Sequence, residues 1–297
     1  MNIEQDQVNE NLSSETPIAL PNVLEANAGD RIDGAFDFIG SSLVEAALAV
    51  EAEMTTISRD EFYSALRLQK IVLSSKLSTH SNNNKEKLQH LLQIIYQEQD
   101  FKMNWKAAFV SKNTLISKVL SRREGIPLTL GILLLDQLKE CGFDANGICF
   151  PSGFLIQVNL ETELLYVDPM SGELPSWDNL SLRIRGHLGN HKQLTLDMLK
   201  ISSNQTIICH LLNVMKAVFL QEDKLELALL CCDILLRIEP DNAYEIRDRG
   251  FLFQQLDCTS VACDDFNHFI DKHPEDPMVN VLREQIEEMK KIKPVLH

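Results

Sequence analysis

A period of 34 residues near the C-terminus constrains the fold more than any other feature of this sequence. Pro240 and Pro274 each follow an amphipathic helical pattern, and Ala228 and Ala262 are separated by the same number of residues. A small residue lets two paired helices approach closely, and a proline stops the second helix of each pair. The pattern predicts a short array of helical hairpins, each of which buries its apolar face against the next.

The length of this period is that of the tetratricopeptide repeat. Phe219 and Phe253 occupy one shared repeat position, and a last amphipathic helix is expected over residues 278–292 to cap the array. We therefore expect residues 201–297 to form tetratricopeptide-like repeats with a terminal helix. Four polar residues in this part of the chain are candidate contacts for a partner: Asn213, Lys216, Arg247 and Arg249. Salt bridges within the array explain the charged ones equally well.

The middle of the chain has a different pattern. Residues 128–135 are apolar almost all round, so the helix predicted over residues 127–140 should be central and buried. Pro127 fits its first turn, where the missing N–H would have no partner in any case. A further helix is predicted over residues 111–120. Three short strands are predicted after the central helix, at residues 145–150, 154–158 and 164–167.

The N-terminal part divides into a tail and a helical region. Residues 1–35 hold seven acidic residues against one basic residue and lack apolar periodicity, which predicts a disordered acidic tail. Capping-box spacing at Ser42 and at Ser58 predicts two helices, and a third is expected over residues 85–97. Residues 36–200 are thus expected to form one domain, in which these helices precede the central helix and the strands.

Charge and cysteine content limit the classes of partner and the compartment. The chain has 297 residues, with 28 Lys and Arg against 43 Asp and Glu, and its formal net charge is −15. Nucleic-acid backbones and anionic membrane surfaces repel such a chain, so we expect neither as a partner. No apolar run approaches the roughly 20 residues that span a bilayer. Seven cysteines without a CxxC pair indicate reduced thiols in the cytoplasm.

Five motifs occur in an order that is specific to one bacterial family. They are NTLI at 113–116, VLSRREGIP at 119–127, FPSGFL at 150–155, VDP at 167–169 and RDRG at 247–250. In these motifs the chain resembles the SirB family, whose members join a transglutaminase-like domain to tetratricopeptide repeats. The resemblance implies a mostly helical α+β protein. Its papain-like, transglutaminase-like core would contain a small antiparallel sheet, with the repeats following it.

The resemblance also assigns positions to a Cys–His–Asp catalytic triad, and two of them are altered. The nucleophile position at the start of the buried helix holds Pro127, and the position of the basic His holds Gly153. Asp168 remains, but a carboxylate without a nucleophile or a proton acceptor performs no acyl transfer. We therefore expect a pseudoenzyme with a degenerate triad and no cofactor, in which Asp168 caps the turn that it begins.

Cys149 is the residue that we weigh as a displaced nucleophile of a thiol-dependent amidase or acyltransferase. It would need a base within hydrogen-bond reach, and no His lies between residues 91 and 186, so His187 or His191 would have to fold back. A small buried cysteine is the commoner outcome. His187 and His191 also have the spacing of a helical metal pair, but they flank Gly189 and have no third ligand. No metal site is expected.

The leading hypothesis is a non-catalytic cytoplasmic protein with a regulatory or scaffolding role. It would bind a protein or peptide partner through its repeats, because the core has lost its nucleophile and its base while keeping its fold signature. The former active-site cleft near Pro127, Gly153 and Asp168 would persist as a pocket.

Overall fold

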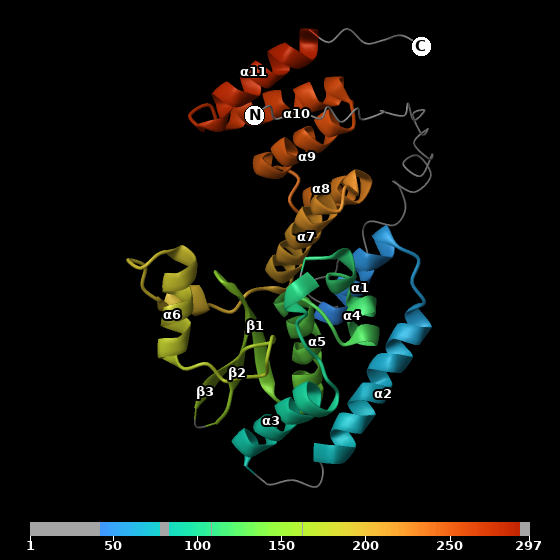
Figure 1. Cartoon of the computed structure of the whole chain (residues 1–297), viewed down its shortest axis with the longest axis vertical. Coiled ribbons are helices and arrows are strands. Elements are labelled where there is room, and N and C mark those ends of the chain that lie inside the picture. The colour runs from blue at the N-terminus through green and yellow to red at the C-terminus, as the bar shows by residue number, and fades with distance from the viewer. Residues whose placement is uncertain (1–41, 78–82, 108, 162, 292–297) are drawn as a thin grey trace, which may run out of the picture. The chain divides into compact units, whose positions relative to one another are not determined.

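The computed structural model describes residues 42–77, 83–107, 109–161 and 163–291 (Figure 1). The chain divides into two units, Met1–Phe36 and Asp37–His297, and all the described elements belong to the second. The tail predicted over residues 1–35 lies outside the described residues. Within them, no helix combines the length and the apolar character that crossing a bilayer requires.

Three helices open the described part, as predicted. They are α1 (Leu43–Met54), α2 (Arg59–Leu77) and α3 (Asn84–Gln93), and a π-helical turn, η1 (Ile94–Glu98), extends α3. Ser42 and Glu45 form a reciprocal capping box at the start of α1. Ser58 accepts a hydrogen bond from the Glu61 N–H, 3.3 Å away, at the start of α2. Both predicted caps are thus confirmed, and each satisfies N–H groups that the first helical turn leaves without a partner.

The central helix is α5 (Pro127–Glu140), and ten of its 14 residues are buried, as the apolar run predicts. It packs against an antiparallel sheet of order β1-β2-β3, formed by β1 (Asp144–Phe150), β2 (Gly153–Asn159) and β3 (Leu164–Val167) (Figure 1). Gly131 allows the close approach of helix and sheet, because a Cβ there would lie 2.4 Å from the Phe154 ring. The predicted strands are confirmed to within a residue.

The helix predicted over residues 111–120 is wrong as a single element. The chain forms a short 3₁₀ turn, η3 (Ser111–Asn113), and only then α4 (Ile116–Arg122). The Asn113 amide donates to the Ala107 carbonyl at 2.7 Å, and the Thr114 hydroxyl donates to the Ser111 carbonyl at 2.9 Å. Such local side-chain bonds compete with a continuous helical ladder, which explains the interruption.

Four further elements connect these parts or stand between them: η2 (Trp105–Ala107), α6 (Trp177–Leu188), η4 (Leu196–Leu199) and α7 (Asn204–Gln221). Helix α6 was absent from the sequence prediction. Its cap explains why it forms, because Ser176 accepts from the Asn179 N–H and the Asn179 side chain accepts from the Ser176 N–H. This arrangement is a capping box with Asn in place of the usual Glu or Gln.

The repeat region consists of helices α7, α8 (Leu225–Ile238), α9 (Ala243–Gln255), α10 (Thr259–Lys272) and α11 (Met278–Lys291). Ala228 and Ala262 are fully buried, and α8 and α10 each end two residues before a proline of the 34-residue period. Helix α11 buries the predicted apolar face: Val279, Leu282, Ile286 and Met289. Glu222 fixes the array to the core, since its carboxylate accepts a hydrogen bond from the Ser111 N–H at 2.7 Å.

Candidate functional site

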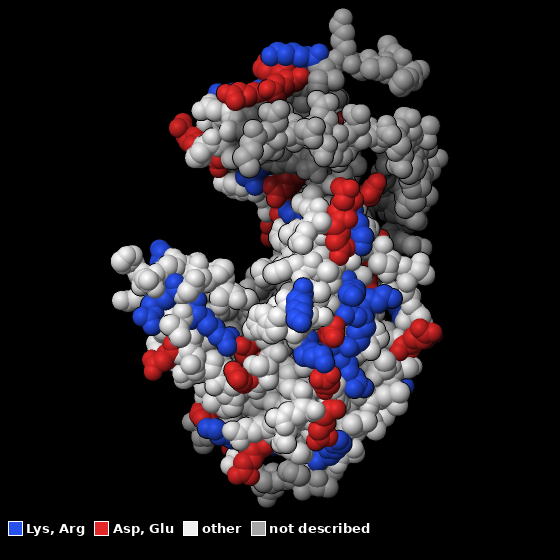
Figure 2. Space-filling view, viewed as in Figure 1, with Lys and Arg blue, Asp and Glu red and all other residues white. Residues whose placement is uncertain are grey.

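The three positions that the resemblance assigns to a catalytic triad line one cleft. Pro127 lies at the start of α5, Gly153 at the start of β2 and Asp168 directly after β3, and all three border a cavity of about 960 Å³. This volume is at the upper end of the range for small-molecule sites. Figure 2 shows the surface hollowed between α6 and α7, whose side chains form two of the cleft walls. The pocket expected at these positions is therefore present.

The start of α5 presents no reactive group to the cleft. Pro127 contributes a ring without an N–H. The Thr129 hydroxyl donates a hydrogen bond to the Asn113 carbonyl at 2.9 Å and accepts one from the Ile126 N–H at 3.2 Å. The N-terminus of the central helix is thus closed by internal hydrogen bonds.

Gly153, at the position that the resemblance assigns to the base, has a backbone conformation that favours glycine. Gly153 follows the two-residue turn Pro151–Ser152 and has a φ of +145°, a conformation that L side chains rarely adopt. No atom lies within 4 Å of the point where a Cβ would stand. An imidazole would therefore have room at this position, but it would strain the backbone of the β1–β2 turn.

Asp168 caps a turn, as predicted, and its side chain is only 2% exposed. Its carboxylate accepts from the Met170 N–H at 2.8 Å and pairs with the Arg183 guanidinium at 2.7 Å. The Tyr96 hydroxyl donates to the Pro169 carbonyl at 2.8 Å, and burial and the nearby Asp168 charge raise the pKa of Tyr96. The remaining triad carboxylate is therefore engaged in holding the turn and α6.

Two imidazoles line the cleft, and the sequence reasoning missed one of them. His187 on α6 and His210 on α7 both border it, but the folding-back alternative required an imidazole within reach of Cys149, which is not part of this lining. Desolvation lowers the pKa of His210, so its ring is neutral at neutral pH. His191 lies instead at a separate hollow with Trp177 and Arg185. Within the described ranges, no three His, Cys, Asp or Glu side chains gather as metal ligands.

Cys149 does not line the cleft. Its thiol is half-buried in β1, and this burial raises its pKa, although a hydrogen bond with Ser202 partly opposes the shift. A raised pKa reduces the thiolate fraction at neutral pH, which is the opposite of nucleophile activation.

The cationic residues proposed as partner contacts are paired within the repeat array. Lys216 is buried, with its ammonium 2.7 Å from Glu245 and 3.0 Å from Asp248. Arg249 makes two hydrogen bonds to Asp265, at 2.9 and 2.7 Å.

The other two candidates also have partners inside the array. Arg247 pairs with Asp248 at 2.7 Å and lies over the rings of Tyr244 and Phe269. The Asn213 amide donates to the Cys209 carbonyl at 3.0 Å. Salt bridges within the array, the alternative that the sequence left open, thus engage the three charged candidates, and Asn213 has a backbone partner.

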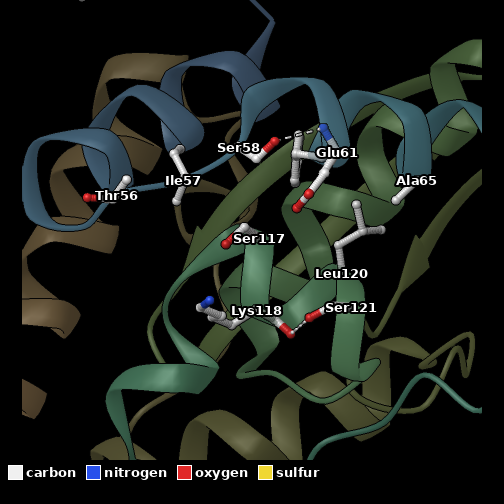
Figure 3. Close-up of a pocket in the computed structure, with 10 residues that line it drawn as sticks. Thr56, Ile57, Ser58, Glu61, Ala65, Ser117, Lys118, Leu120 and Ser121 are labelled. Atoms are coloured by element: carbon white, nitrogen blue, oxygen red, sulfur yellow. Dashed lines mark hydrogen bonds between the residues drawn. The ribbon is translucent and has the colours of Figure 1, made fainter.

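A second hollow, of about 340 Å³, lies between the start of α2 and α4. Figure 3 shows Ser58, just before α2, and Glu61 of α2 on one side of it and Ser117, Lys118 and Ser121 of α4 on the other. Behind it the buried Glu51 carboxylate accepts from the Ser117 N–H at 2.8 Å and from the Ser117 hydroxyl. A carboxylate at a helix N-terminus is favourable, so Glu51 fixes α1 to α4.

Comparison with known proteins agrees with this architecture. A family model described as the transglutaminase-like superfamily matches residues 63–213, and one described as the tetratricopeptide repeat matches residues 215–287. The chain is 37% identical over 252 residues to the UPF0162 protein of Vibrio cholerae. The aligned residues make up 84% of this chain and 93% of that protein.

Two further relatives extend the comparison. Protein SirB1 of Salmonella typhimurium is 31% identical over 213 residues, which is 71% of this chain and 79% of that protein. The UPF0162 protein YchA of Escherichia coli is 30% identical with the same coverage of both chains. No solved structure matches the chain significantly. The chain therefore belongs to the transglutaminase-like superfamily, and within it to the SirB family that its sequence motifs resemble.

Proposed function

We propose that this chain is a non-catalytic cytoplasmic protein that binds a protein or peptide partner and acts as a regulator or scaffold. The observation that carries the proposal is the composition of the cleft at three positions. Pro127, Gly153 and Asp168 border one open cavity, and its helix start offers no nucleophile. A cleft of this volume without a nucleophile at Pro127 or a base at Gly153 is suited to binding rather than to turnover.

Three features of the cleft support the absence of acyl transfer. The φ of Gly153 suits glycine and not histidine, so the loss of the base is built into the backbone. The Asp168 carboxylate accepts a hydrogen bond from the Met170 N–H and forms an ion pair with Arg183. The displaced candidate, Cys149, lies outside the cleft lining and has a raised pKa.

The repeats support a role in protein binding. Arrays of this kind present extended surfaces to partners, and here the first repeat helix, α7, also forms a wall of the cleft through His210 and Val214. A partner bound along the repeats can therefore continue into the former active site.

Photo-crosslinking in cells tests the proposal. A benzophenone amino acid replaces Phe109 at the cleft mouth, Tyr244 on the repeats or, as a control, Leu68 on an exposed part of α2. We expect a discrete protein adduct from position 109 or 244 and none from position 68. Purified protein should not hydrolyse or transfer amides or thioesters. Absence of adducts at both test positions would contradict the proposal, and so would turnover that a cleft substitution abolishes.

A further inference from the structure

We propose that the cleft binds an extended acidic segment of the partner, anchored by a large apolar side chain between Trp105, Phe109 and Val214. This inference rests on the proposed function and names the chemistry of the partner at that site. It follows from the exposed aromatic rings at the cleft mouth, from the hydrogen bonds of the backbone beside them and from the positive charge of Lys106 in the cleft.

The mouth of the cleft exposes apolar surface that a folded chain normally covers. The side chains of Trp105 and Phe109 are 70% and 59% exposed, although both border the cavity. Met103, Val110 and Val214 of α7 line the same cavity. Exposed Trp and Phe beside a deep apolar pocket are typical of the central residues of protein interfaces.

The segment that carries these rings is held at both ends. Lys102 and Arg123 are joined by a backbone hydrogen bond of 2.9 Å, and the Ser111 N–H donates to Glu222 on the far side. Asn113 fixes the middle by donating to the Ala107 carbonyl at 2.7 Å. Hydrogen bonds therefore hold the described backbone on both sides of the aromatic residues, which reduces the entropy lost when a ligand binds.

The Lys, Arg and Asp side chains of the cleft lining are Lys106, Arg183 and Asp168, so their formal charges sum to a positive value in a strongly acidic protein. Lys106 lines it, and no carboxylate pairs with its ammonium among the described residues. Asp168 is the carboxylate of the lining, and Arg183 neutralises it. Figure 2 shows further Lys and Arg side chains gathered over α4, which follows the mouth segment, and the chain as a whole has a net charge of −15. Charge complementarity therefore selects an acidic occupant over a basic one.

The shape of the cleft favours a peptide chain as the occupant. Its lining comes from six parts of the chain: the mouth segment, the start of α5, the β1–β2 turn with the start of β2, the turn after β3, α6 and α7. A segment of about ten residues spans roughly 33 Å when extended, which is enough to leave the cleft along α7 towards the repeats. The apolar anchor would fill the cavity while its acidic neighbours face Lys106.

Intrinsic fluorescence tests the inference directly, because the chain contains two tryptophans. In the Trp177→Phe variant, Trp105 is the single reporter, and Trp177 borders a different hollow. The probes are three blocked peptides of about ten residues each. One has a Phe-Leu pair flanked by Asp and Glu, one has Lys in place of the acids, and one has Ser in place of the Phe-Leu pair.

We expect the acidic apolar peptide to shift Trp105 emission to shorter wavelength in a saturable way. Each of the other two peptides should bind about tenfold more weakly or worse. Lys106→Glu should weaken the acidic peptide by a similar factor, whereas Lys200→Glu, on an exposed residue outside the lining, should not. Circular dichroism of both variants verifies that they are folded.

Equal affinity for the three peptides, or no effect of Lys106→Glu, would overturn the inference. Tighter binding of oligothymidylate than of the acidic peptide, or self-association detected by light scattering, would also overturn it by assigning the surface to another occupant. Adducts from position 244 without peptide binding would refute the inference and leave the proposed function standing. Absence of adducts from both positions would refute the proposed function itself.

Discussion

Replacement of Lys216 by Met separates a structural role of this residue from a role in partner binding. The ammonium lies 2.7 Å from Glu245, and the two side chains are only 9% and 10% exposed. Met fills the space of the aliphatic stem, so the variant removes the charge with little cavity. The Glu245 carboxylate then stays buried without its counter-ion.

Removal of one partner of a buried ion pair costs about 3–5 kcal/mol. We expect a loss of about 3 kcal/mol, at the lower end, because both groups keep some contact with solvent. The second contact, to Asp248, adds little, because that carboxylate is 32% exposed and solvent screens it. The stability of wild type and variant is measured by urea unfolding followed by far-UV circular dichroism. Fluorescence is unsuitable, since Trp105 and Trp177 both precede the repeats.

Two further variants make the experiment decisive. Glu245→Gln in the Lys216→Met background removes the stranded charge and should recover part of the lost stability. Lys200→Met removes an exposed ion pair with Asp197 and should leave the unfolding midpoint unchanged. If Lys216→Met costs less than about 1 kcal/mol, the pair with Glu245 is not the buried interaction assumed here, and Lys216 returns as a candidate partner contact.

Three more predictions follow from the geometry. Gly172→Ala should destabilise the chain by about 1–3 kcal/mol more than Gly142→Ala in urea unfolding. Both glycines have a positive φ, but only at Gly172 would the added Cβ lie 2.3 Å from the Tyr96 ring, so equal effects would contradict this. Because burial raises the pKa of the Cys149 thiol, it should react with iodoacetamide more slowly than free cysteine at pH 7.5, and its reaction rate should still rise above pH 9. A fast reaction at neutral pH that is absent in Cys149→Ser would support the thiol-enzyme alternative. Burial opposes the charged form of Lys216, but the neighbouring Cys232, Glu245 and Asp248 outweigh it and raise the pKa of Lys216. The stability contributed by its charged form should therefore be complete below about pH 10 and decline above it. A stability difference between wild type and Lys216→Met that grows with pH would refute this assignment.

Local patterns were sufficient to predict most of the elements. The prolines at 240 and 274, the capping serines at 42 and 58, and the apolar run from Leu128 to Leu135 each act within a few turns of chain. Helix caps, helix stops and buried faces depend on such near neighbours, so their positions can be inferred without the fold. The interruption at Asn113 and the helix α6 were missed, because polar side chains decided them through specific hydrogen bonds.

The side chains at two positions of the candidate site could also be predicted from the sequence motifs. Pro127 and Gly153 carry no nucleophile and no base, whatever surrounds them, and the family motifs located both positions. What these motifs could not indicate was the positive φ of Gly153, which depends on the pairing of β1 with β2.

The sequence by itself determined the helical repeats and the buried central helix, since each depends on residue type and short spacing. Only the tertiary structure brought His210 and Val214 of α7 to the same cavity as Trp105, and only it paired Lys216 with Glu245, 29 residues further along the chain. These contacts join segments whose separation along the chain carries no periodic signal. They exist because packing of α7 against the core and against α9 brings the segments together, and that packing is a property of the whole fold.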